Sequence, residues 1–180
     1  KVKEIYLINS LINIFMDNPG QIIDVNNLSR ELGISRQTLS NYLTYLEESF
    51  LIRKLYNYSK NQRKIERKLK KYYPSLLSVN LLFKEDDISK SKVFESLLVN
   101  QLNAEFFWRD PYKNEVDIVL NNLPIEIKLN YSNPKGIITF MNKFRINKGY
   151  IIVQNEEKEI NDNKKKILII PAFKFLLDAK

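Results

Sequence analysis

The sequence predicts a chain of mixed α and β structure, with a helix-rich first half and an α/β second half built around a central mixed sheet. Two observations predict this. Apolar residues recur at helical spacing in the first half, whereas short runs with period-two alternation fill the second half. With 180 residues, 44% of them hydrophobic, the chain can bury two modest cores. We expect one domain over residues 1–83, a linker at 84–91 and a second domain over 92–180.

The first half begins with an amphipathic helix over residues 2–16, which the sequence NPG ends. A helix-turn-helix pattern follows within residues 25–55. It needs a cap for its first helix, a residue with positive φ in its turn and a cap for its second helix. The residues at these positions are Asn26 or Asn27, Gly33 and Ser35.

The segments LIRKLYNYS and KKYY read as two strands with the basic NQRKIERK between them, which makes the first domain a winged helix-turn-helix. The second helix of the pattern would present polar side chains able to meet phosphates or base edges in a major groove. These are Arg36, Gln37, Ser40, Asn41 and Thr44. The alternative is a winged helix that packs against a neighbouring domain or protein and never touches DNA.

The positive charge of the chain is concentrated in one segment. The formal net charge is +8, and residues 53–71 hold nine basic residues and one acidic residue, so they carry the whole excess. Such a patch is typical of a nucleic-acid partner, most simply double-stranded DNA. The expected contacts are Lys60, Arg63, Lys64, Arg67 and Lys68. The alternative is a solvated loop whose lysines serve only solubility.

The composition excludes several kinds of chemistry. The chain has no cysteine and no histidine, so thiolate or imidazole metal sites and His-based catalysis are absent, and a metal must be held by oxygen. Oxygen ligands suit Mg²⁺ or Mn²⁺. No glycine lies in a P-loop context, so we expect no nucleotide site. No apolar run reaches membrane-spanning length, so we expect no membrane partner and a cytoplasmic location.

The second half should contain the following elements in order. We expect a short buried helix at 75–83, a helix in KSKVFESLLVNQLNA that Ser89 caps, strands in EFFWR, EVDIVL and PIEIKL, a helix in NPKGIITFMNKF, strands in GYIIV and KILIIP, and a closing helix in AFKFLLDA.

The strands EVDIVL and PIEIKL should form a hairpin with Asn121-Asn122 as a two-residue turn. This register puts Asp117 opposite Glu126 and Glu115 opposite Lys128. Opposed carboxylates repel unless a cation lies between them, so Asp117 and Glu126 are predicted metal ligands. The alternative is a solvent-facing hairpin in which Glu115 and Lys128 form a surface salt bridge of little energetic value.

Four residues of the second half resemble the E…D…E-x-K signature of the PD-(D/E)XK nuclease superfamily. They are Glu95 on the leading helix, Asp117 on the second strand, and Glu126 and Lys128 on the third. The resemblance implies a core of one helix, three strands, a helix and a strand. It further implies that Asp117 and Glu126 bind the metal, that Glu95 assists and that Lys128 is catalytic. The alternative for Glu95 is an ordinary exposed helix residue.

The segments KKYYPSLLS, VFESLLVNQL, FFWRDPYKNEVDIVL, LPIEIKLNYS and KGIITFMNKF also resemble a prokaryotic family of AAA-type ATPases, in which a winged helix and a nuclease-like domain of unknown function follow the ATPase module. The resemblance implies a DNA-binding module with a Mg-dependent deoxyribonuclease site, an ATPase module upstream in the full polypeptide and, because such nucleases often act as dimers, a homodimer. The alternative is a catalytically inactive regulatory module that binds nucleic acid or protein. We expect Trp108 and Arg109, which precede the hairpin, to border the cleft of the nuclease-like site. The alternative for Trp108 is a place in the core.

Overall fold

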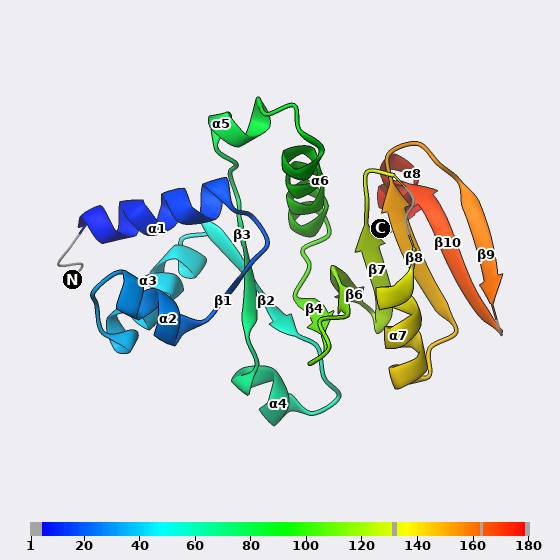
Figure 1. The fold of residues 1–180 in the computed structure, drawn as a ribbon, viewed down its shortest axis with the longest axis horizontal. Coiled ribbons are helices and arrows are strands. Elements are labelled where there is room, and N and C mark those ends of the chain that lie inside the picture. The colour runs from blue at the N-terminus through cyan, green and yellow to red at the C-terminus, as the bar shows by residue number, and fades with distance from the viewer. Residues whose placement is uncertain (1–4, 131–132, 163, 179–180) are drawn as a thin grey trace.

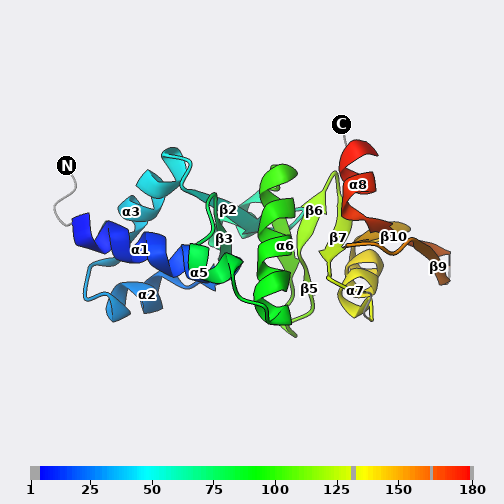
Figure 2. The ribbon, with the colours of Figure 1, turned by 90° about the horizontal axis from the view of Figure 1, so that it is seen from above.

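The computed structural model describes residues 5–130, 133–162 and 164–178, without the side chains of Glu66, Arg67 and Asp178. The described residues form an α+β fold with two five-stranded mixed sheets. Figure 1 shows helices α1 to α3 at one end of an elongated molecule, the second sheet at the other end and α6 between them. The view from above places α6 in the same middle position (Figure 2). Within the described residues, no helix is long and apolar enough to cross a membrane.

Three helices form the N-terminal end of the molecule: α1 (Ile5–Asp17), α2 (Val25–Glu31) and α3 (Arg36–Glu48). The predicted turn at Gly33 is confirmed by its φ of 67°, and Ser35 caps α3 by accepting a hydrogen bond from the Thr38 N–H. The predicted cap of α2 was wrong. Asp24 caps this helix by accepting from the N–H groups of both Asn26 and Asn27, since a carboxylate ahead of the first turn can satisfy two free donors.

The first sheet has the strand order β1-β3-β2-β4-β5. Its strands are β1 (Gln21–Ile23), β2 (Ile52–Asn57), β3 (Lys70–Pro74), β4 (Phe106–Arg109) and β5 (Glu115–Val116). The expected pairing of β2 with β3 is confirmed as antiparallel. The basic segment between them forms a short helix, α4 (Gln62–Arg67), which Asn61 caps. The strand pair is not a free hairpin, because β1 flanks β3 and β4 lies parallel to β2.

The expected linker at residues 84–91 is shorter than predicted. Helix α6 (Asp87–Gln101) begins inside it, and Asp86 caps the helix by accepting from the N–H and the hydroxyl of Ser89, both at 2.8 Å. Ser89 was expected to be the cap and is instead the donor. Strands from both sides of the linker share the first sheet, because β4 pairs with β2.

The helix expected at residues 75–83 is also shorter and more exposed than predicted. Only Val79–Leu82 are helical (α5), and of its apolar residues Leu81 alone is buried. Val79 and Phe83 are largely exposed. Ser78 caps this single turn, so the apolar run forms a capped surface turn rather than a core helix.

The second sheet has the strand order β6-β7-β8-β10-β9. It consists of β6 (Ile118–Leu120), β7 (Leu123–Ile127), β8 (Lys148–Val153), β9 (Lys158–Asp162) and β10 (Lys165–Pro171), with helices α7 (Lys135–Phe144) and α8 (Ala172–Asp178). Strands β7 and β8 are parallel, and α7 connects them. Strand β9 was not predicted; four of its five residues are exposed, so it has no apolar alternation.

The sheet is buried on both sides. Ile118 and Ile125 pack in one cluster with residues of α6 and α8, and Val119 packs in another with Phe140 and Met141 of α7.

The start of α7 lies directly against β5. A Cβ atom on Gly136 would come 2.0 Å from the Glu115 carbonyl oxygen, so only glycine permits this approach.

Replacing Asp86 with alanine should destabilise the fold at neutral pH, because the α6 cap is lost. The hydrogen bond from the Ser89 N–H, together with that from its hydroxyl, lowers the pKa of Asp86 below 3.8. A lowered carboxyl pKa gives stability that is complete above the unfolded-state value and is lost as the pH falls through the folded-state value. We expect the thermal midpoint of Asp86→Ala to lie below that of the wild type at neutral pH and to approach it in acid. Asp87→Ala is the matched control and should change the midpoint less; equal effects of the two variants would contradict the assigned cap.

Candidate functional site

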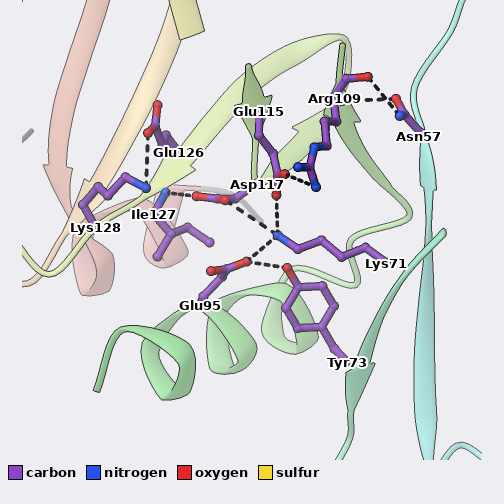
Figure 3. A network of polar contacts seen from close by, with 10 residues as sticks. All are labelled: Asn57, Lys71, Tyr73, Glu95, Arg109, Glu115, Asp117, Glu126, Ile127 and Lys128. Carbon is purple, nitrogen blue, oxygen red and sulfur yellow. Dashed lines mark hydrogen bonds and ion pairs between the residues drawn. The ribbon is translucent and has the colours of Figure 1, made fainter. Parts of the chain in front are cut away.

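A cluster of charged residues lies where β3, α6, the β5–β6 junction and β7 meet (Figure 3). We call it the carboxylate cluster. Its members are Lys71 and Tyr73 of β3, Glu95 of α6, Glu115 of β5, Asp117 between β5 and β6, Glu126 of β7 and Lys128 just beyond β7. The structure therefore brings together all four residues of the predicted signature and adds Lys71 and Tyr73, which the sequence did not assign to the site.

Lys71 lies at the centre of the carboxylate cluster and is only 5% exposed. Its Nζ atom is 2.8 Å from an oxygen of Glu95, 2.8 Å from an oxygen of Glu115 and 3.9 Å from an oxygen of Asp117. Burial by itself would lower the pKa of Lys71, but the surrounding acidic groups, Glu95 foremost, raise it well above 10.5. The ammonium group is therefore charged and supplies positive charge to three carboxylates.

Glu95 is fixed by two partners. It accepts a hydrogen bond from Lys71 and another from the Tyr73 hydroxyl, the latter at 2.5 Å. Burial favours the neutral form of Glu95, but the charge and hydrogen bond of Lys71 outweigh it and lower the pKa of this carboxyl. Glu95 is thus an ionised, oriented member of the cluster, and the alternative of an ordinary exposed helix residue was wrong.

The hairpin register is confirmed near the turn and was wrong beyond it. Asn121 and Asn122 both have positive φ, and the pairs from Leu120↔Leu123 to Ile118↔Ile125 are those predicted. The ladder then stops, because the preceding strand β5 turns to pair with β4. The chain bends at Asp117.

The bend changes the partners of both acidic residues before β6. Asp117 does not pair with Glu126 across a ladder; its Oδ2 atom accepts a hydrogen bond from the Ile127 N–H at 2.8 Å. Glu115 contacts Lys71 and Arg109 instead of Lys128. Lys128 contacts Glu126 at 3.2 Å. Since Asp117 and Glu126 are buried, the alternative of a solvent-facing hairpin was wrong as well.

The positive charge around Asp117 and Glu126 does not offset the effect of burial on their carboxyl groups. Burial, followed by the charge of Glu95, raises the pKa of Asp117 to about 7. Burial also raises the pKa of Glu126, and its Oε2 atom is buried without a hydrogen-bond partner among the described residues. Burial opposes the charge of Lys128, but Asp117 and Glu126 outweigh it and raise the pKa of the lysine. A perturbed pair of this kind is typical of a functional site.

The donor set of Asp117 and Glu126 fits a hard divalent cation. Mg²⁺ commonly uses one or two protein carboxylates and fills its other positions with water or substrate oxygens. The orphaned Glu126 oxygen and the raised pKa values are what a bound cation would relieve. Within the described residues, no group of three or more His, Cys, Asp or Glu side chains is arranged to hold a metal ion.

The predicted DNA contacts fall into two groups. On α3, Arg36, Gln37, Asn41 and Thr44 are exposed and Ser40 is half-buried. On and around α4, Lys60, Arg63 and Lys64 are exposed and Lys68 is half-buried; the side chain of Arg67 lies outside the described residues. In Figure 1, α3 lies beside β2 and β3, and α4 lies at their lower end.

Trp108 belongs to the core, which was one of its two predicted places. It is fully buried and packs edge-on against Phe140 at 5.4 Å between ring centroids. Arg109 borders the carboxylate cluster, with Nη1 3.6 Å from Glu115. Its backbone is held by Asn57, which donates to the Arg109 carbonyl and accepts from the Arg109 N–H.

Comparison with protein families gives a match for residues 1–75 with a family described as "Domain of unknown function (DUF8612)". Comparison with curated proteins and with solved structures gave no match. The family match covers helices α1 to α4 and strands β1 to β3, and so it includes Lys71 and Tyr73 but none of the cluster's acidic residues.

Replacing Lys71 with methionine should lower the free energy of unfolding by about 3–5 kcal/mol, the usual cost of leaving buried charges without their partner. Methionine keeps most of the side-chain volume, so the loss reports the charge. Urea denaturation measures it. Lys166→Met is the matched control: Lys166 pairs with Glu159 at 2.7 Å on the surface, and its loss should cost less than about 1 kcal/mol. Equal losses would show that the ammonium group of Lys71 does not stabilise the cluster.

Proposed function

We propose that this chain is a nucleic-acid-processing module, in which a winged helix-turn-helix binds DNA and a PD-(D/E)XK nuclease-like domain hydrolyses phosphodiesters with Mg²⁺ or Mn²⁺. One observation carries the proposal. Glu95, Asp117, Glu126 and Lys128 come from three different elements, and their ionisable groups influence one another's pKa in a single cluster.

The order of elements supports the proposal. Helix α6, strand β4, the bent strand β5–β6, strand β7, helix α7 and strand β8 follow one another as helix, three strands, helix and strand. Strands β6 and β7 are antiparallel, and β8 returns parallel to β7. The resemblance found in the sequence implies this order.

Each residue of the cluster has a role in the proposed reaction. Asp117 and Glu126 would hold the metal, which when bound polarises a phosphodiester and lowers the pKa of a coordinated water. Lys128, placed by Glu126, can stabilise charge that develops on the phosphate or position the attacking water. Glu95 is held by Lys71 and Tyr73, and its charge acts on the neighbouring carboxyl group of Asp117.

The DNA-binding part of the proposal rests on the first half of the chain. Helices α2 and α3 are joined at Gly33, α3 keeps a polar exposed face, and β2 and β3 follow as a strand pair. This arrangement supports a winged helix whose α3 enters a major groove. Association with an AAA-type ATPase rests on the sequence resemblance alone.

A specific observation also favours a second function, a regulatory module without catalysis. Lys71 already provides a cation to Glu95, Glu115 and Asp117. A buried ammonium group can stabilise such a cluster without any metal, so the cluster could be structural. A module of this kind would bind DNA in a salt-dependent way and would cut nothing.

Cleavage of DNA tests the first function directly. Purified protein should cut duplex DNA with Mg²⁺ or Mn²⁺ and not with a chelator present. Asp117→Asn should abolish cutting, and Lys128→Ala should reduce the rate by about 10²–10³-fold, as for loss of one group that stabilises the transition state. The matched controls are two exposed residues of the second sheet, Asp162→Asn on the edge strand β9 and Lys166→Ala on β10, which should cut at the wild-type rate. Wild-type activity in Asp117→Asn would refute the assignment.

Thermal unfolding with and without Mn²⁺ separates the two functions. A metal that binds only the folded state stabilises it by about 2.7 kcal/mol at a concentration of 100 times its Kd. The midpoint of the wild type should therefore rise with Mn²⁺, and that of Asp117→Asn should not. An unchanged wild-type midpoint at saturating Mn²⁺ would favour the regulatory module.

A further inference from the structure

A hollow of about 730 Å³ lies between α4, β4, the β4–β5 loop and α7. We call it the basic hollow. In Figure 1, α4 and α7 lie along the lower edge of the molecule, with β4 between them. The volume falls within the range of pockets that hold a ligand as large as one nucleotide.

The basic hollow gathers positive charge from three separate parts of the chain. Its basic lining residues are Lys64 and Lys68 from α4 and its end, Arg109 and Lys113 from β4 and the loop after it, and Lys143 from α7. Within the described residues, none of the four lysines forms an ion pair with an acidic side chain, and Arg109 forms an ion pair with Glu115 alone.

Among the described residues of the lining, Asp110 is the one acidic side chain, and it does not neutralise these groups. Its two oxygens accept from the backbone and side-chain N–H groups of Asn114, at 2.9 and 2.8 Å. Lys143 contributes to lowering the pKa of Asp110, but no ion pair joins the two. The hollow therefore keeps a positive excess.

Two lysines of the hollow, Lys68 and Lys143, make contacts that place their side chains. Lys68 is half-buried and donates to the carbonyl of Tyr58 at 3.2 Å. Burial, followed by the like charges of Lys143 and Lys64, lowers the pKa of Lys68. Lys143 lies 5.3 Å from the ring centroid of Trp108. Holding like charges together is unfavourable, and an anion in the hollow would offset it.

Aromatic side chains also line the hollow. Tyr58 and Phe144, both half-buried, meet edge to face with ring centroids 5.2 Å apart. Trp108 is fully buried, and its Nε1 donor has no partner among the described residues. A ligand that suits this lining has an anionic group for the lysines and a flat or apolar part for the rings, as a nucleotide unit has.

The basic hollow adjoins the carboxylate cluster through Arg109. This residue lines the hollow, and its guanidinium group lies 3.6 Å from Glu115, which in turn contacts Lys71. A strand whose phosphate is held in the hollow would thus have a neighbouring phosphate within reach of the cluster.

We propose that the basic hollow binds a phosphodiester unit of a single nucleic-acid strand, with its phosphate on Lys64, Lys68, Arg109 and Lys143 and its sugar or base against Tyr58 and Phe144. Binding here needs no metal, and only the delivery of the strand to the carboxylate cluster rests on the proposed nuclease function.

Fluorescence anisotropy with a short labelled single-stranded DNA, in the presence of a chelator, tests the proposal apart from cleavage. The double variant Lys64→Ala/Lys143→Ala should weaken binding about tenfold. Loss of two phosphate contacts should also reduce the slope of log affinity against log salt by about 1.4, at about 0.7 for each contact with a single strand. Both lysines are exposed, and equal thermal midpoints of variant and wild type would verify the fold.

The matched control is Lys84→Ala/Lys90→Ala, which removes the same charge from exposed positions in the α5–α6 loop and in α6. In Figure 1, α5 and α4 lie at opposite ends of the first sheet. The control should bind like the wild type. A hollow variant that binds like this control would overturn the proposal, whatever the cleavage assay gives. If the wild type cuts no DNA and the Lys64→Ala/Lys143→Ala variant loses binding, this inference is upheld and the proposed nuclease activity is refuted.

Competition identifies the ligand class. Unlabelled single-stranded DNA should displace the probe far better than a mononucleotide or polyglutamate at equal phosphate or carboxylate concentration. A mononucleotide that competes equally would overturn the claim for a strand, and polyglutamate that competes equally would overturn the claim for phosphate.

Discussion

The buried ammonium group of Lys71 fixes how the two halves of the chain meet. A charge taken out of water costs several kcal/mol unless it is paired and hydrogen-bonded. Lys71 meets this requirement only when Glu95 and Glu115 both lie 2.8 Å from it. Helix α6 and strand β5 must therefore stand against β3 in one arrangement, and the Tyr73 hydroxyl on the same face of β3 adds a second contact to Glu95. The first sheet, which joins β2 to β4, is consistent with this requirement.

The carboxylates around Lys71 differ in the direction of their pKa shifts. Glu95 receives positive charge from Lys71, and its pKa is lowered despite burial. Burial, followed by the charge of Glu95, raises the pKa of Asp117 to about 7, although the same ammonium group lies 3.9 Å away and opposes this rise. Among the described residues, Glu126 forms an ion pair with Lys128 alone and retains a buried oxygen without a hydrogen-bond partner. One buried lysine thus satisfies part of an acidic cluster, whereas Asp117 and Glu126 keep raised pKa values.

Local signals in the sequence predicted those parts of the fold that local interactions determine. The turn at Gly33, the cap at Ser35 and the Asn121-Asn122 turn all depend on residues within a few positions. The bend at Asp117 could not be predicted in this way, because its cause is the pairing of β5 with β4. Strand β9 was missed because its polar residues pair at an edge with β10, where no apolar face is needed. Asp117, Glu126 and Lys128 were found by their spacing on the hairpin, and Glu95 by the resemblance to the nuclease signature. Lys71 was missed because a lysine within a basic run is usually exposed.

The basic run itself illustrates how one sequence feature can serve several structural purposes. Arg53 donates to the side chains of Asn100 and Asn103, which ties β2 to the end of α6. Lys54 pairs with Glu47 of α3 at 2.6 Å. Lys71 pairs with acidic residues of the carboxylate cluster. The side chains of Arg53, Lys54 and Lys71 are therefore engaged within the protein rather than with a polyanion. What is left to face an external partner is centred on α4, and Lys64 and Lys68 there meet charges contributed by β4 and α7. The charge excess of the sequence is thus only partly exposed at the surface, and its exposed part on α4 shares a hollow with Arg109, which contacts Glu115 of the carboxylate cluster.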